Sequence, residues 1–152
     1  MISVAIVERA LDAAVLQAAV AAPNAGAIAL FVGVVRDENG GRVVNGIEYT
    51  AYSGMATREL EAVAREAVER FGGVRIAVEH RIGSLAVGDA SVVVAVAHAH
   101  RLSALEACRF VIEQLKQRVP IWKREHYVDG TREWVHASSA AVGSPAPAAA
   151  TP

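Results

Sequence analysis

The sequence has one cysteine, few aromatic residues and almost no net charge, and these scarcities exclude several classes of protein. A single cysteine among 152 residues forms no disulfide within the chain, so we expect a cytoplasmic protein. The formal net charge of −1 lacks the excess that broad binding of nucleic acid or anionic membranes requires. No stretch reaches the ~20 apolar residues of a membrane span. Any anion-binding site must therefore be a local cluster of charge.

The sequence is instead rich in aliphatic residues. Hydrophobic residues make up 53% of it and aromatic residues only 5%, so the core must consist mainly of Val, Ile, Leu and Ala. The length fits one domain. We place a single catalytic or binding domain at residues 1–136 and interpret residues 137–152, rich in Ala, Ser and Pro, as a disordered tail.

Hydrophobic patterning predicts an α+β fold with a mostly antiparallel sheet. Buried strands are expected at 27–35 and 91–99, which are apolar on both faces. Because a polar, glycine-containing turn precedes another strand at 43–52, we expect it to form a hairpin with 27–35. Further strands at 2–7 and 74–78, and helices at 11–22 and after Ser53-Gly54, are not in strict βαβ alternation. This order favours helices packed on one side of the sheet.

A third helix has the clearest boundaries. Ser103 and Glu106 have the spacing of a capping box, which predicts a helix start at Ser103. Pro120 disfavours helical geometry at the preceding residue and predicts the end of the helix there. Between these limits one apolar stripe is expected on the helix, formed by Leu105, Cys108, Ile112, Leu115 and Val119.

Basic residues gather at both ends of this helix. His100 and Arg101 precede it, Lys116 lies in its last turn, and Lys123 follows Pro120 in extended chain. If the chain folds back, the two ammonium groups disfavour each other's charged form, which lowers one pKa and creates an acid/base or nucleophilic group. From spacing alone, ordinary solvated lysines near the helix C-terminus are the favoured interpretation.

Other polar residues give weaker indications. Arg36 ends one apolar strand as Arg101 follows another, and such arginines suit phosphate, although either one alone is more simply a solvated strand end. His98 and His100 would share a strand face, but no third ligand has matching spacing, so we expect no metal site. We interpret Cys108 as a small core hydrophobe rather than an exposed, activated thiolate.

Six motifs, taken in order, resemble one known family, that of molybdopterin synthase catalytic (large) subunits. The resemblance extends from residue 26 to residue 135 and implies a fold of the α/β-hammerhead type. The motifs are Gly26 to Arg36, Ile47 to Tyr52 with Met55-Ala56, His80 to Leu85 with Gly88-Asp89, His100-Arg101, Leu115-Lys116 and Pro120 to Glu125.

The resemblance implies a sulfur transfer. Such subunits take sulfur from the C-terminal Gly-Gly thiocarboxylate of a small ubiquitin-like carrier subunit and pass it to cyclic pyranopterin monophosphate, forming the dithiolene of molybdopterin. Their assembly is a central dimer of large subunits with a small subunit at each end, a heterotetramer, and we expect no cofactor. A sulfur supplied by a partner also fits the absence of an exposed cysteine.

The resemblance also implies roles for individual residues. Lys116 would be the catalytic acid/base, and Lys123 would assist it; both would also bind substrate. The remaining residues implied to bind or line the same site are Arg36, His100, Arg101, Arg124 and Glu125.

Two alternatives use the same cationic cluster. One is a non-catalytic module that binds a phosphorylated metabolite, and the other is an interaction subunit whose pocket is a socket for a partner's tail. Both predict binding without formation of a dithiolene product.

Overall fold

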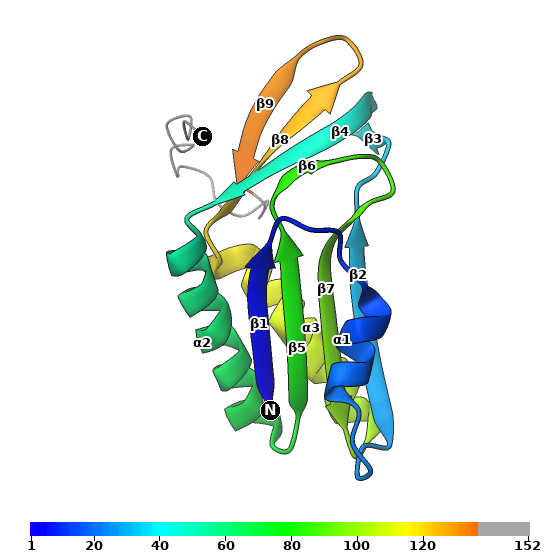
Figure 1. The fold of residues 1–152 in the computed structure, drawn as a ribbon, viewed down its shortest axis with the longest axis vertical. Coiled ribbons are helices and arrows are strands. Elements are labelled where there is room, and N and C mark those ends of the chain that lie inside the picture. The colour runs from blue at the N-terminus through cyan, green and yellow to red at the C-terminus, as the bar shows by residue number, and fades with distance from the viewer. Residues whose placement is uncertain (137–152) are drawn as a thin grey trace.

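The computed structural model describes residues 1–136, and the tail predicted at 137–152 lies outside the described residues. Figure 1 shows the arrangement of the elements. In chain order they are β1 (Ile2–Val7), α1 (Ala13–Val20), β2 (Ala27–Val34), β3 (Glu38–Asn39), β4 (Arg42–Ala51), α2 (Ser53–Phe71), β5 (Arg75–Arg81), β6 (Gly83–Leu85), β7 (Ala90–His98), α3 (Arg101–Arg118), β8 (Ile121–Tyr127) and β9 (Arg132–His136).

The strands form two sheets, and the second sheet lies across one end of the first (Figure 1). The first sheet has the order β1-β5-β7-β2 and is antiparallel except for the parallel β1–β5 pair. The second has the order β3-β4-β8-β9, with β6 also paired to β4, and is antiparallel throughout. The predicted α+β class and the mostly antiparallel sheet are therefore confirmed.

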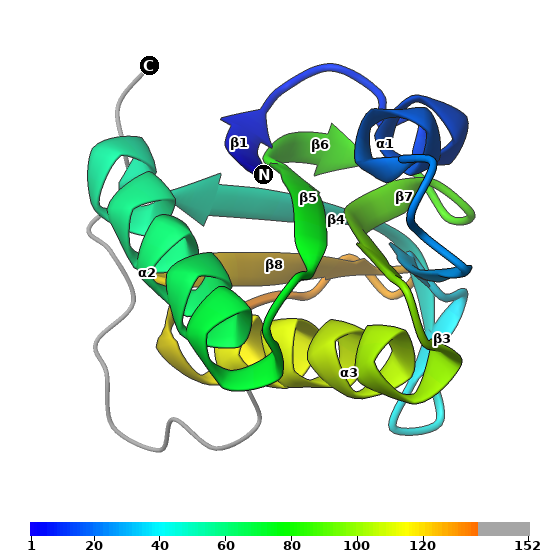
Figure 2. The same cartoon turned by 90° about the horizontal axis from the view of Figure 1, so that it is seen from below.

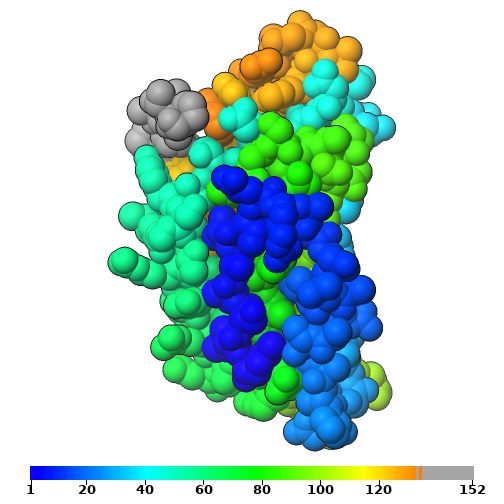
Figure 3. Space-filling model, in the orientation of Figure 1, coloured from blue at the N-terminus to red at the C-terminus, as the bar shows by residue number. Residues whose placement is uncertain are grey.

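Helices cover both faces of the first sheet. The long helices α2 and α3 bury their apolar stripes, including Leu60 and Leu115, in the main core. The short helix α1 lies on the opposite face (Figures 2 and 3). It packs Leu16 and Val20 in a second core with residues such as Val93 of β7. The prediction that all helices share one side is wrong for α1, because β7 is apolar on both faces and each face needs cover.

The strand β2 differs from its prediction. It is apolar throughout, as a buried strand would be, yet it lies at the edge of the first sheet. It also forms no hairpin with β4, because it pairs with β7 while β4 pairs with β8 and β6. An apolar strand needs a covering partner, and the part of the chain that the structure describes leaves much of β2 exposed. Five large side chains of β2 are exposed: Ile28, Leu30, Phe31, Val32 and Val34.

The helix α3 begins two residues earlier than predicted. His100 is its N-cap, and the His100 carbonyl accepts the first helical hydrogen bond from the Ala104 N–H at 3.2 Å, so Ser103 already lies in the first turn. Leu105, predicted on the apolar stripe, is 60% exposed. The end of the helix agrees with the prediction, since α3 stops at Arg118 and Pro120 leads directly into β8.

Candidate anion-binding active site

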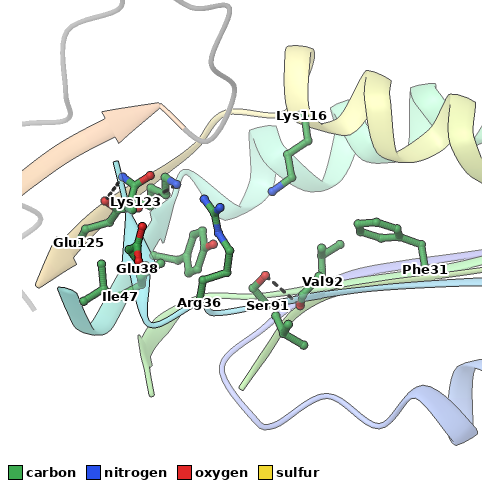
Figure 4. Close-up of a pocket in the computed structure, with 14 residues that line it drawn as sticks. Phe31, Arg36, Glu38, Ile47, Ser91, Val92, Lys116, Lys123 and Glu125 are labelled. Carbon is green, nitrogen blue, oxygen red and sulfur yellow. Dashed lines mark hydrogen bonds and ion pairs between the residues drawn. The ribbon is translucent and has the colours of Figure 1, made fainter. Parts of the chain in front are cut away.

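A cavity lies where the C-terminal end of α3 meets the two sheets (Figure 4). Its volume is about 150 Å³. Lys116 reaches it from α3, Lys123 from β8, and Arg36 from the segment that follows β2, so the structure brings three predicted cationic residues together. The other lining residues are Phe31, Gly33, Val34, Glu38, Asn39, Val44, Ile47, Tyr49, Ser91, Val92 and Glu125.

Lysine use singles out this cavity. Lys116 and Lys123 are the only lysines in the whole sequence, and all other permanently basic side chains are arginines. Lysine and arginine are not equivalent here, because a buried ammonium group can lose its proton whereas a guanidinium stays charged. This signal was available in the sequence, although clustering of charge alone does not reveal it.

The two lysines have different surroundings. Lys123 Nζ lies 3.1 Å from Glu125 Oε1 in an ion pair. Among the side chains that the structure describes, no carboxylate forms an ion pair with Lys116. Burial lowers the pKa of Lys116, and the nearby charge of Lys123 lowers it further. Lys116 therefore gives up its proton more easily than a solvated lysine does.

Glu125 is the acidic centre of the cavity and is only 2% exposed. Its Oε2 atom accepts hydrogen bonds from Asn39 Nδ2 and from the Tyr127 hydroxyl, each at 2.5 Å. Burial raises the pKa of Glu125, but the hydrogen bonds from Tyr127 and Lys123 outweigh burial and leave the pKa lowered. The side chain is thus held as a carboxylate.

The floor of the cavity is built from neutral polar groups. Tyr49 and Ser91 line it, and the Ser91 hydroxyl donates to the Gly33 carbonyl at 3.2 Å. Behind Tyr49 lies His80, fully buried, with ring centroids 5.1 Å apart. Burial lowers the pKa of His80 to about 4, and the charge of Lys116 acts in the same direction, so His80 is neutral at physiological pH.

Sequence reasoning assigned no role to Asn39, Tyr49 or Ser91. Alternation along β4 does predict that Tyr49 shares a face with Ile47, but no sequence pattern predicts that β4 lies across the end of β7. Asn39 belongs to a polar turn that has no hydrophobic period. The structure shows instead that this turn is paired to β4 and bonded to Glu125.

Three predicted site residues lie away from the cavity of this chain. His100 and Arg101 line a separate hollow at the other end of α3, and an 18-residue helix spans roughly 27 Å. Arg124 lies on the face of β8 opposite to Lys123, where it pairs with Glu48 at 2.5 Å. Strand alternation explains this last result, because neighbouring residues on β8 point to opposite faces.

Other features predicted from the sequence can be located as well. Cys108 is 6% exposed in the core, as expected, and burial raises the pKa of its thiol to about 11. Among the described residues, no three His, Cys, Asp or Glu side chains gather as metal ligands, and the pair His98 and His100 is no exception. No described helix is long and apolar enough to cross a membrane.

The fold and cavity together define an α+β protein with a small, partly desolvated cationic pocket suited to anionic ligands.

Comparison with known proteins gives the family. The family described as "MoaE protein" matches residues 6–118. A molybdopterin synthase catalytic subunit from Synechococcus elongatus is 50% identical over 111 residues, covering 72% of this chain and 67% of that protein. Molybdopterin synthase catalytic subunit 1 of Mycobacterium tuberculosis is 47% identical over 118 residues, 78% of this chain and 80% of that one.

Solved structures agree with these sequence matches. The crystal structure of molybdopterin synthase from Staphylococcus aureus has a TM-score of 0.83 and 33% identity, covering 86% of this chain and 95% of that one. A complex of subunits 1 and 2 of molybdopterin-converting factor from Helicobacter pylori has a TM-score of 0.71 and 27% identity, covering 90% and 91%. The chain belongs to the MoaE protein family. It is an enzyme subunit, the catalytic subunit of a molybdopterin synthase in molybdenum cofactor biosynthesis, which confirms the resemblance seen in the sequence.

Proposed function

We propose that the cavity is where sulfur passes from the C-terminal thiocarboxylate of a small carrier subunit to cyclic pyranopterin monophosphate. The convergence of Lys116, Lys123 and Arg36 carries this proposal. Both reactants are anions that repel each other in water. A partly desolvated group of cations offsets that repulsion and holds the reacting atoms together.

The surroundings of each cation suggest its task. Lys116, with its lowered pKa, serves as the general acid/base of the sulfur transfer and stabilises the carboxylate that the carrier regains. Lys123, held by its ion pair with Glu125, binds an anionic group of the substrate. Arg36 offers a planar fork of donors that matches phosphate.

We propose a small ubiquitin-like subunit as the sulfur donor, whose C-terminal tail enters the cavity. The Helicobacter pylori complex of subunits 1 and 2 supports a two-subunit assembly. The absence of an activated thiol among residues 1–136 also supports a donor that brings its own sulfur, because Cys108 is buried. We further propose that residues 1–136 form the single catalytic domain and that the protein acts in the cytoplasm.

We propose a second copy of the chain as a further partner, seated on the edge strand β2. Five large apolar side chains of β2 are exposed. Leu102 and Leu105, which line the hollow that contains His100, are exposed by 64% and 60%. An apolar edge of this size is typical of an interface between subunits.

The direction of β2 supports a shared site. Its first residue, Ala27, pairs with His98 beside His100 and Arg101, and its last residue, Val34, lines the cavity. If two β2 strands pair antiparallel about a two-fold axis, the first end of one lies beside the last end of the other. His100 and Arg101 of one copy would then reach the cavity of the other. The cavity in one chain has a volume of about 150 Å³. Small-molecule sites usually have roughly 300–1,000 Å³, so the smaller volume fits a site that a second chain completes.

A reconstituted reaction tests the proposed function. The purified chain, a thiocarboxylated carrier subunit and cyclic pyranopterin monophosphate are mixed, and dithiolene product is measured. We expect product with the wild type and with the control Arg109→Ala, whose side chain is exposed on the same helix. Wild-type protein that binds both reactants without forming product would support the non-catalytic binding module instead.

A further inference from the structure

Asn39 and Tyr127 flank the buried carboxylate of Glu125 on the side away from Lys123. Both donate to the same oxygen, Oε2, at 2.5 Å, while Lys123 lies 3.1 Å from the other oxygen, Oε1. The two donors also contact each other, with Asn39 Nδ2 3.4 Å from the Tyr127 hydroxyl. The carboxylate therefore has one oxygen saturated by neutral groups and one oxygen directed at a lysine.

We propose that Asn39 and Tyr127 are positioning residues that divide the work between the two lysines. By occupying Oε2 they fix the orientation of Glu125, so that Oε1 holds the Lys123 side chain in its ion pair. Lys116, which the carboxylate does not reach, is left as the lysine that exchanges protons. The catalytic meaning of this division rests on the proposed function, whereas the division itself is a property of the folded chain.

The neutrality of the two donors is central to this arrangement. An arginine or lysine in their place would neutralise Glu125 and weaken its attraction for Lys123, whereas an amide and a phenol satisfy Oε2 and leave the charge intact. The donors are themselves held in place. Asn39 lies on β3, which pairs with β4 at Arg42, and the Arg42 guanidinium stacks 3.5 Å above the ring of Tyr127.

Several charged and titratable groups surround the two lysines, and their positions bear on the test. The segment before and within β3 contributes one cation and one carboxylate, β4 contributes a phenol, and β5 contributes an imidazole behind that phenol. These groups are Arg36, Glu38, Tyr49 and His80. None of them forms an ion pair with Lys123 among the described side chains, so a change confined to Lys123 is attributed to its ion-pair partner, Glu125.

The scarcity of lysine makes a direct test simple. An amine-reactive reagent can modify only Lys116, Lys123 and the amino group of Met1. Trace labelling is followed by peptide mass spectrometry from pH 6 to 10, in the wild type, Tyr127→Phe and Asn39→Leu. In the wild type we expect Lys116 to react faster than Lys123 at neutral pH. In both variants the ion pair of Lys123 with Glu125 should loosen and Lys123 should gain reactivity about tenfold, while Lys116 and Met1 change less than about twofold.

Matched controls are available within the chain. Tyr52→Phe removes a hydroxyl from a tyrosine that is 55% exposed, and Asn45→Leu changes an exposed asparagine on β4. Both should leave all three labelling rates unchanged. Equal reactivity of the two lysines in the wild type, or an unchanged Lys123 in both Tyr127→Phe and Asn39→Leu with their melting temperatures retained, would overturn the proposal. If one variant fails to fold, the other decides the outcome.

A kinetic experiment tests whether the different roles of Lys116 and Lys123 matter for catalysis. In the reconstituted reaction Tyr127→Phe should lower kcat about tenfold with KM changed less than twofold, and should cost nothing further in a Glu125→Gln background. Full additivity of the two substitutions would count against positioning through Glu125. If the labelling pattern is found but the wild type forms no dithiolene, the proposed function fails while the positioning role stands.

Discussion

The two ends of α3 both carry basic side chains, yet they are built in different ways. At the C-terminal end, Lys116 enters a cavity whose other members come from β2, β4, β7, β8 and the segment around β3. At the N-terminal end, His100 and Arg101 lie in an open hollow among exposed leucines. One end is a preorganised pocket, and the other resembles half of an interface. Basic residues at both ends of a helix therefore do not by themselves indicate one site within one chain.

The largest expected effect is at the C-terminal end of α3. Lys116→Ala removes the group with the lowered pKa, and we expect a loss of at least ~10³-fold in kcat, in the range of lost acid/base catalysis. Dithiolene formation in single-turnover experiments measures it, with Arg109→Ala as the control. Undiminished product with Lys116→Ala would contradict the acid/base role of Lys116, and with it the catalytic difference between the two ends of α3.

A second effect concerns stability beneath the cavity. The pKa of His80 is about 4 in the folded chain and 6.5 when unfolded, so the unfolded state binds more protons between these values. The contribution of His80 to the free energy of unfolding is therefore fully present above pH 6.5. It is lost as the pH drops to about 4, and the loss amounts to about 3 kcal/mol. Urea unfolding across this range should show the loss in the wild type and a flatter profile in His80→Phe. His98→Asn, at the far end of the sheet, should keep the wild-type slope.

A third effect tests whether the two ends of α3 meet across a dimer. Arg101→Ala alone should lower kcat/KM by about 10- to 100-fold, the loss of one charged contact. Mixing Arg101→Ala with Lys116→Ala allows heterodimers in which one site has both native residues, so activity should return to about a quarter of the wild type. If mixtures that are shown to exchange subunits recover no activity, Arg101 and Lys116 do not act together in one site across the dimer.

The smallest effect is at the N-cap of α3. His100 makes no side-chain cap hydrogen bond, so His100→Asp should supply one and raise the free energy of unfolding by about 0.5–1 kcal/mol. Activity should fall in the same variant, because an imidazole near the proposed shared site is replaced by a carboxylate. Thermal unfolding and the reconstituted reaction measure the two quantities. A more stable variant with full activity would remove His100 from the site.

Much of the fold could be predicted from local pattern. The central strand β7, the helix α2 ended by Gly72, and the end of α3 before Pro120 all follow from periodicity and breaker residues. Two strand assignments failed for a common reason. Periodicity indicates whether a strand is covered, but not by which element, so β2 was wrongly paired with β4 and wrongly expected to be buried within the chain.

The candidate site was predictable only in part. Convergence of Lys116 and Lys123 follows from the helix stop at Pro120 and the return of the chain as β8. Asn39 and Tyr49 come from distant segments, and their approach depends on how the second sheet crosses the first. Arg124 illustrates the limit of motif reasoning, because it lies within the most specific motif yet points to the other face of β8.

The exposed edge of β2 has a consequence for behaviour in the cell. The proposed two-fold contact would use this edge once in each copy, so the assembly would close at two chains with both β2 edges covered. A substitution that blocks the pairing, such as Leu30→Glu, would do more than produce an inactive monomer. It would leave four of the five apolar side chains of β2 exposed on a strand whose outer edge is free, a template for edge-to-edge aggregation. Loss of soluble protein during expression should therefore accompany the loss of turnover.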